Sequence, residues 1–211
     1  MVSRAWLPDA SGPTLIGGAL CLDFTNSIVP RRGDDRLDYL SDYPSLLRWS
    51  RHAGVLSGAE AGRLAAEAAR RRADAAGVAV RAIAFREALY RIFSAVAANS
   101  PFDSADVDQA NAELTAALSR LRVAPAKPAR QWTWAGDAAA LDRPLWSVAR
   151  AAADLLTSPL LVRVRECPSR ACGRLFVDHT RNGNRRWCGA ACGSRDKARR
   201  YYARKTRAAR R

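Results

Sequence analysis

The chain has 211 residues, 48% of them apolar, which is enough to bury one core beside a small second module and excludes wholesale disorder. No apolar run approaches the roughly 20 residues that cross a bilayer, and the glycine-broken run at 15–20 is too short for a signal peptide. We therefore expect a cytoplasmic protein without a membrane partner. Thiols stay reduced there, so clustered cysteines indicate metal binding before disulfides.

Positive charge is concentrated in one quarter of the sequence. The formal net charge is +15, and residues 160–211 account for +13 of it, with 16 Lys and Arg against 3 Asp and Glu. Codon bias does not explain this asymmetry, because it can replace lysine by arginine throughout a sequence but cannot concentrate positive charge in one segment. The asymmetry indicates a polyanionic partner, with nucleic acid preferred over an anionic membrane surface.

Apolar periodicity predicts a mostly helical region over residues 1–158. In chain order we expect a short strand at 19–24, a turn and short helix at 37–49, and helices at 57–74, 80–98 and 104–122. Ser57 lies three residues before Glu60, which is a capping-box pattern for a helix start. A strand at 131–134 and a helix at 143–157 follow. The predicted fold class is α+β, a mostly helical domain with a small sheet.

Four of the five cysteines lie within 26 residues of the basic segment. Cys167, Cys172, Cys188 and Cys192 have the spacing C-x4-C-x15-C-x3-C. Two close pairs separated by a spacer suit tetrahedral zinc, because each tight turn supplies two thiolates. Glycines directly after the second and third cysteines permit the cramped backbone around a metal. We predict one structural Zn²⁺, since four thiolates leave no open position for water or substrate.

The remaining cysteine and histidines have simpler explanations. Cys21 is far from the four in an apolar segment, where a core thiol is expected. His179 lies in the spacer and is an alternative zinc ligand, but a solvent-facing loop histidine is the more frequent role. His52 is the only other histidine, which weakens any hydrolase or second-metal hypothesis.

The zinc segment reads as a strand at 160–164 leading to Cys167, a hairpin in the spacer, and a helix from the second cysteine pair to the end. This order is typical of a treble-clef-like finger, predicted over 160–211. The final helix has basic residues almost all round and no apolar stripe, so it is either solvated or laid against a polyanion. The predicted nucleic-acid contacts are Arg185, Arg186, Arg195, Lys197, Arg199, Arg200, Arg204 and Lys205. Among them Arg195 is the predicted reader of a guanine edge.

These motifs resemble the CGNR zinc-finger family of bacterial proteins, in which this module follows an amino-terminal ABATE domain. The resemblance rests on Cys167-x4-Cys172-Gly-Arg-Leu-Phe-Val-Asp, Arg-Arg-Trp-Cys188 and Cys192-Gly-Ser-Arg-x-Lys, and in the first region on Leu-Cys-Leu-Asp-Phe-Thr-Asn26 and Phe-Arg86-Glu-Ala-Leu. Ser194 stands where the name-giving motif has asparagine; both side chains cap, so we expect the zinc fold to be retained. The resemblance implies a stress-induced transcription regulator.

Four polar residues of the first region have two interpretations. In the first interpretation, a ligand pocket is lined by Asp23, Asn26, Arg86 and Glu87. In the other, which we favour, Asp23 and Arg86 form a buried salt bridge and Asn26 caps a turn. No nucleophile–base set or phosphate-binding glycine loop accompanies them, so we do not expect an enzyme.

The predicted function is zinc-dependent DNA binding by a transcription regulator, with DNA favoured over RNA. Residues 1–158 would be a separately stable domain that serves ligand sensing or assembly, for example as a homodimer. Two alternatives stay open. One is an RNA- or ribosome-binding zinc module, and the other is an enzyme in the first region that the finger brings to nucleic acid.

Overall fold

The computed structural model describes residues 12–32, 36–125 and 130–208. The helices are α1 (Leu20–Thr25), α2 (Tyr43–His52), α3 (Gly58–Arg70), α4 (Arg72–Ala97), α5 (Ser104–Leu118), α6 (Arg143–Leu156) and α7 (Ala190–Ala208), with a 3-10 helix η2 (Pro159–Arg163). The strands are β1 (Ile28–Val29), β2 (Leu37–Asp38), β3 (Leu121–Ala124), β4 (Gln131–Trp134), β5 (Val164–Glu166) and β6 (Leu175–Val177), which form three antiparallel pairs in sequence order. The α+β class with small sheets is confirmed.

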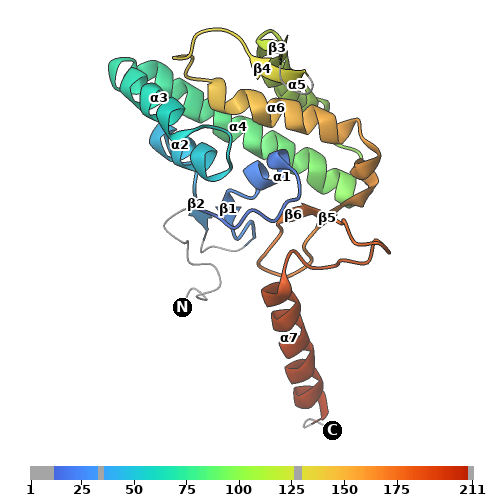
Figure 1. Ribbon diagram of the computed structural model, residues 1–211. Coiled ribbons are helices and arrows are strands. Elements are labelled where there is room, and N and C mark those ends of the chain that lie inside the picture. Colours follow the sequence, from blue (N-terminus) through green and yellow to red (C-terminus); the bar gives the residue numbers. More distant parts are fainter. Residues whose placement is uncertain (1–11, 33–35, 126–129, 209–211) are drawn as a thin grey trace.

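Helix α4 is the centre of the main core. Helices α1, α2, α3 and α5 pack on it, and α6 packs on α1 and α5, as Figure 1 shows. Phe24 of α1 lies between Trp49 and Phe85, with ring centroids 5.1 and 5.9 Å away, and all three side chains are buried. No helix in the described part of the chain is both long and apolar enough to cross a membrane.

The expected strand at 19–24 is wrong, because these residues form helix α1. The amides of Leu22 and Asp23 both donate to the Ala19 carbonyl at 3.0 Å, which starts the helix. Burial on several sides of this short segment gives an apolar run, and such a run fits a buried strand and a buried helix equally well. Tertiary packing decides between them.

Other boundaries also differ from the predictions, among them the start of the helix expected over 80–98, which begins at Arg72 as α4. The helix expected over 57–74 breaks at Arg71, whose φ and ψ of −122° and 59° are not helical. The helix expected to reach 122 ends at Leu118, because residues 121–124 pair with 131–134 as β3 and β4. Residues 159–163 form η2, so the strand before the first cysteine begins only at Val164.

Other sequence predictions are confirmed. Ser57 and Glu60 form the reciprocal capping box at the start of α3. The hydrogen bonds of Glu60 with the Ser57 backbone, and then with its hydroxyl, lower the pKa of Glu60 to about 2. Helix α6 and strand β4 occupy the expected ranges within a residue.

The zinc segment shares its core with the helical region. Val164, Leu175 and Val177 belong to the main buried cluster. Asn26 closes the open edge of β6: its Nδ2 donates to the Leu175 carbonyl at 2.7 Å, and its Oδ1 accepts from the Leu175 amide at 2.9 Å. The Val177 amide donates to the Gly17 carbonyl along the same edge. The two regions therefore share part of one core. The separate stability of residues 1–158 and the boundary near residue 159 stay predictions.

We predict that Asn26→Ala lowers the free energy of unfolding by about 2–4 kcal/mol, because it leaves the buried amide and carbonyl of Leu175 without partners. Denaturant unfolding followed by circular dichroism measures the change. Asn111→Ala, at an exposed site of α5, is the control and should stay within about 0.5 kcal/mol of the parent protein. Equal effects of the two substitutions would contradict this role of Asn26.

Candidate metal centre and basic helix

The first cysteine pair lies in the tight connection between β5 and β6. Cys167 directly follows β5, and its amide donates to the Arg174 carbonyl at 2.9 Å, which extends the strand pairing. The Cys172 amide donates to the Ser169 carbonyl at 2.8 Å and closes the turn. Gly173 has φ +66°, and a Cβ there would lie 3.1 Å from the Tyr90 hydroxyl, so the turn needs glycine.

The second cysteine pair lies at the start of α7. Arg185 shapes its approach, because Nη2 donates to the Cys188 carbonyl at 2.6 Å and the guanidinium lies 4.4 Å from the Phe176 ring centroid. Buried Asp178 accepts hydrogen bonds from the Arg185 and Thr180 amides at 2.9 and 2.8 Å. Hydrogen bonding, first from the Thr180 hydroxyl, lowers the pKa of Asp178. These contacts hold the loop that leads into α7.

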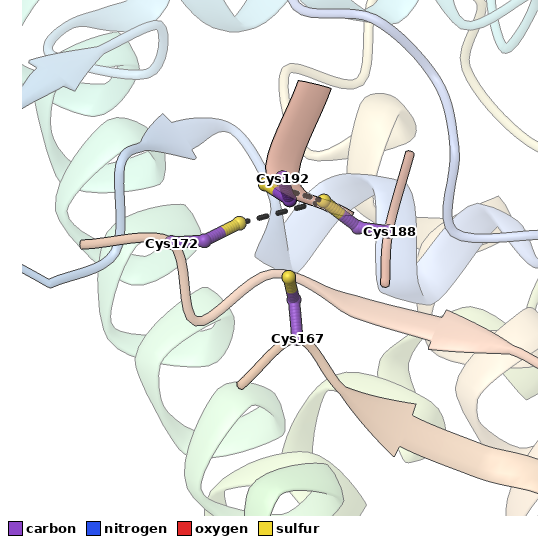
Figure 2. Close-up of side chains that lie close together, drawn as sticks. All are labelled: Cys167, Cys172, Cys188 and Cys192. Atoms are coloured by element: carbon purple, nitrogen blue, oxygen red, sulfur yellow. Dashed lines mark hydrogen bonds between the residues drawn. The ribbon is translucent and has the colours of Figure 1, made fainter. Parts of the chain in front are cut away.

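The four cysteine side chains converge on one point, as Figure 2 shows. All four are buried, and their sulfurs lie within 4.8 Å of one another. Cys188 Sγ is 3.4 Å from Cys172 Sγ and 3.5 Å from Cys192 Sγ, far beyond the length of a disulfide bond. A tetrahedron with Zn–S bonds of about 2.3 Å has edges of about 3.8 Å. The donor set therefore fits one tetrahedral zinc ion.

The charge balance of the cluster also favours a cation. Side-chain hydrogen bonding with Cys167, and then with the other thiols, raises the pKa of Cys188 above its usual range. Bound Zn²⁺ supplies the positive charge that lets thiols at this spacing ionise together.

Two arginines surround the sulfurs. Arg195 Nη2 donates to Cys192 Sγ at 3.1 Å. Burial alone would lower the pKa of Arg174, but the charges of Cys188 and Cys172 outweigh burial and raise it. Donors and positive charge around thiolate ligands stabilise their ionised form and orient them on a metal.

Sequence profiles of two families match the chain. The ABATE profile, described as "Putative stress-induced transcription regulator", matches residues 18–159, and the CGNR zinc finger profile matches residues 163–205. The chain belongs to the ABATE family. The comparison with curated proteins found no match. The finger profile and the sulfur geometry agree, so the four cysteines of this ABATE protein bind one structural zinc.

The predicted nucleic-acid contacts fall into two groups. Arg185 and Arg195 are partly buried, and their guanidinium groups bond the Cys188 carbonyl and the Cys192 sulfur. A base contact by Arg195 stays a prediction, although its guanidinium already has a partner in the metal centre. The other group is exposed to solvent and consists of Arg186, Lys197, Arg199, Arg200, Arg204 and Lys205. His179 is exposed as well and lies outside the sulfur cluster.

The four polar residues of the ABATE region have structural partners. Arg86 pairs with Asp38, at 2.6 and 2.9 Å, and with Glu87, so the expected Asp23–Arg86 salt bridge is wrong. Asp23 instead accepts from the Gly17 amide at 2.7 Å. Asp38 lies on strand β2 and Arg86 on helix α4. No local sequence pattern predicts this pairing, because the two residues are far apart in the sequence. A ligand pocket at these four residues stays a prediction.

Sequence reasoning also missed the contacts of Glu166. Its carboxylate accepts from the Ser94 hydroxyl at 2.5 Å and the Tyr90 hydroxyl at 3.2 Å, and it pairs with Arg32. Burial, and then the charge of Glu166, raises the pKa of Tyr90 to about 12, so this hydroxyl keeps its proton and donates. The sequence indicates these contacts only through the position of Glu166, an acidic residue next to the zinc ligand Cys167 in a basic segment.

We predict one zinc per chain in freshly purified protein, and no zinc in the double variant Cys188→Ser with Cys192→Ser. Chelation should unfold the β5–β6 connection and α7, because few apolar contacts hold them, while most of α1–α6 stays helical. Elemental analysis and circular dichroism measure both effects. Cys21→Ala is the control and should keep one zinc. Substoichiometric zinc in the parent protein, or zinc retained by the double variant, would refute the ligand assignment.

We also predict that Arg195→Ala weakens zinc binding about 10–100-fold, because it removes a donor to a zinc-binding sulfur. Competition with a chromogenic chelator measures the affinity. Lys197→Ala removes the same charge from an exposed position two residues later and should change the affinity less than twofold. Equal reductions would show that net charge, and not the hydrogen bond to Cys192, acts on the metal.

Proposed function

We propose that this ABATE protein is a transcription regulator that binds DNA through α7, and that it has no enzymatic activity. The observation that carries the proposal is the form of this helix. Its 19 residues extend away from the folded body in Figure 1, with their first turn held by the zinc ligand Cys192. A helix of this length is about 28 Å long and fits the major groove of B-form DNA.

The charges of α7 support a polyanionic partner. The side chains of Lys197, Arg204 and Lys205 are exposed. Arg199 and Arg200 pair with Asp196 at 3.0 and 2.9 Å, but their side chains are 67% and 61% exposed, and such surface pairs are weak. These arginines remain accessible to phosphates, whose contacts dominate the affinity of DNA-binding proteins. DNA binding would place the protein at the nucleoid.

One observation favours RNA as the second candidate. Tyr201 and Tyr202 are 54% and 65% exposed, with ring centroids 5.5 Å apart. Exposed aromatic rings next to basic residues stack on unpaired bases, which are more abundant in structured RNA than in duplex DNA. Duplex DNA remains the preferred partner because α7 is long, is held at its first turn by a zinc ligand, and is basic on several sides.

The absence of an enzymatic role is also part of the proposal. Four thiolates saturate a tetrahedral zinc ion, so this centre has no open position at which to activate water or substrate. In the ABATE region the side chains of Asp23, Asn26, Arg86 and Glu87 are engaged with the protein itself.

We predict that the Arg204→Ala, Lys205→Ala double variant weakens duplex binding for all sequences alike. The slope of log K against log salt should become shallower by about 0.9 for each phosphate group that the variant no longer binds. The control is Arg51→Ala with Arg63→Ala, which removes the same charge from exposed positions of α2 and α3. Fluorescence anisotropy with duplex DNA and a structured RNA hairpin at several salt concentrations measures both.

Three outcomes distinguish the alternatives. Tighter binding to the duplex than to the hairpin, weakened selectively in the α7 variant, supports the proposal. Preference for the hairpin, reduced by Tyr201→Ala with Tyr202→Ala, assigns RNA. Equal reductions in the α7 and control variants would show that total charge, and not α7, determines the affinity.

A further inference from the structure

The ABATE region contains an apolar groove at a distance from the metal centre. It has a volume of about 520 Å³ and lies among α2, α3 and the first half of α4. Binding sites for small organic molecules typically span roughly 300–1,000 Å³ and are mostly apolar with a few polar groups. The size of this groove lies within that range.

Small side chains and a helix break create the groove. Helices α3 and α4 are separated only by the non-helical residue Arg71, so the chain changes direction between them while α2 packs on both. Alanines face the groove on each side of the break: Ala65, Ala68 and Ala69 on α3, and Ala75, Ala76 and Ala79 on α4. Larger side chains at these positions would fill the space that alanine leaves.

The walls require an apolar occupant. Leu47, Val80 and Ile83 line the groove, and the Val80 side chain is 68% exposed. Tyr43 also lines it, but its hydroxyl donates to the Leu141 carbonyl at 2.8 Å. An apolar molecule in the groove would remove these aliphatic surfaces from water, and that burial is the main source of binding free energy.

Two charged residues lie at the rim of the groove. Asp42 lies at the rim, but its carboxylate accepts from the Ser45 amide at 2.8 Å as the cap of α2. Arg72 also lines the groove, is exposed, and forms no ion pair within the described residues. Its guanidinium therefore has donors available for a carboxylate or another anionic group.

We propose that this groove binds a small organic molecule with an apolar body and one anionic group, such as a medium-chain carboxylic acid. The apolar body lies against the alanine-lined walls of α3 and α4, and the anionic group pairs with Arg72. The site is separate from the zinc centre and from α7, and the proposal does not depend on nucleic-acid binding.

The test uses the full-length zinc protein and 8-anilinonaphthalene-1-sulfonate, a fluorescent apolar anion, displaced by decanoate or 1-decanol. Ala65→Phe fills the groove, and Ala66→Phe is its control on an exposed neighbouring position that does not line it. We expect at least tenfold weaker probe and decanoate binding in Ala65→Phe and less than a twofold change in Ala66→Phe. Ala76→Phe replaces Ala65→Phe if thermal unfolding shows that the latter is misfolded.

The charge of the ligand is tested by Arg72→Gln. It should weaken decanoate binding about tenfold and leave 1-decanol binding unchanged, whereas Arg63→Gln, an exposed change outside the groove, should alter neither. Probe binding that survives both groove-filling variants would assign it to another surface such as basic α7 and overturn the proposal. Equal weakening of decanoate and decanol binding in Arg72→Gln would overturn the anionic part.

Discussion

Zinc–thiolate coordination is the interaction on which the carboxy-terminal quarter of the molecule depends. Within the part of the chain that the structure describes, the local core there consists of the four cysteines and Phe176, with Ile16 and Trp187 packed against it. So small an apolar cluster cannot offset the entropy of ordering the connections around it. The metal joins the β5–β6 turn to the start of α7, and it thereby fixes the direction of the helix that carries the nucleic-acid contacts we propose.

A second layer of interactions joins the metal centre to the helical region. The Arg31 amide donates to the Cys172 carbonyl at 2.8 Å, while the Arg31 side chain pairs with Glu87 and lies 4.0 Å from the Tyr90 ring centroid. On the other side of this contact, Glu166 binds Ser94 and Tyr90. Buried polar pairs of this kind contribute little net stability, but they disfavour other arrangements, because any shift leaves a buried charge unpaired.

The sequence predicted those features that depend on local spacing. The cysteine positions, the Ser57–Glu60 capping box and helix α6 follow from short-range patterns, and each is found where expected. Non-local contacts were not predictable in this way. Burial on several sides made α1 look like a strand, and Asp38 replaced Asp23 as the partner of Arg86. In each case the deciding contact comes from tertiary packing or from a side-chain orientation that spacing does not specify.

The anchorage of α7 at one end makes it a lever. Its 19 residues rise about 28 Å, so a tilt of about 10° at the metal would displace the far end by about 5 Å. Lys197, near the pivot, would move little under such a tilt, whereas Arg204 and Lys205 would sweep across a distance comparable to the spacing between adjacent phosphates. If α7 binds DNA as we propose, such a tilt would let its outer turns follow grooves of different width and curvature, while its first turn would move little.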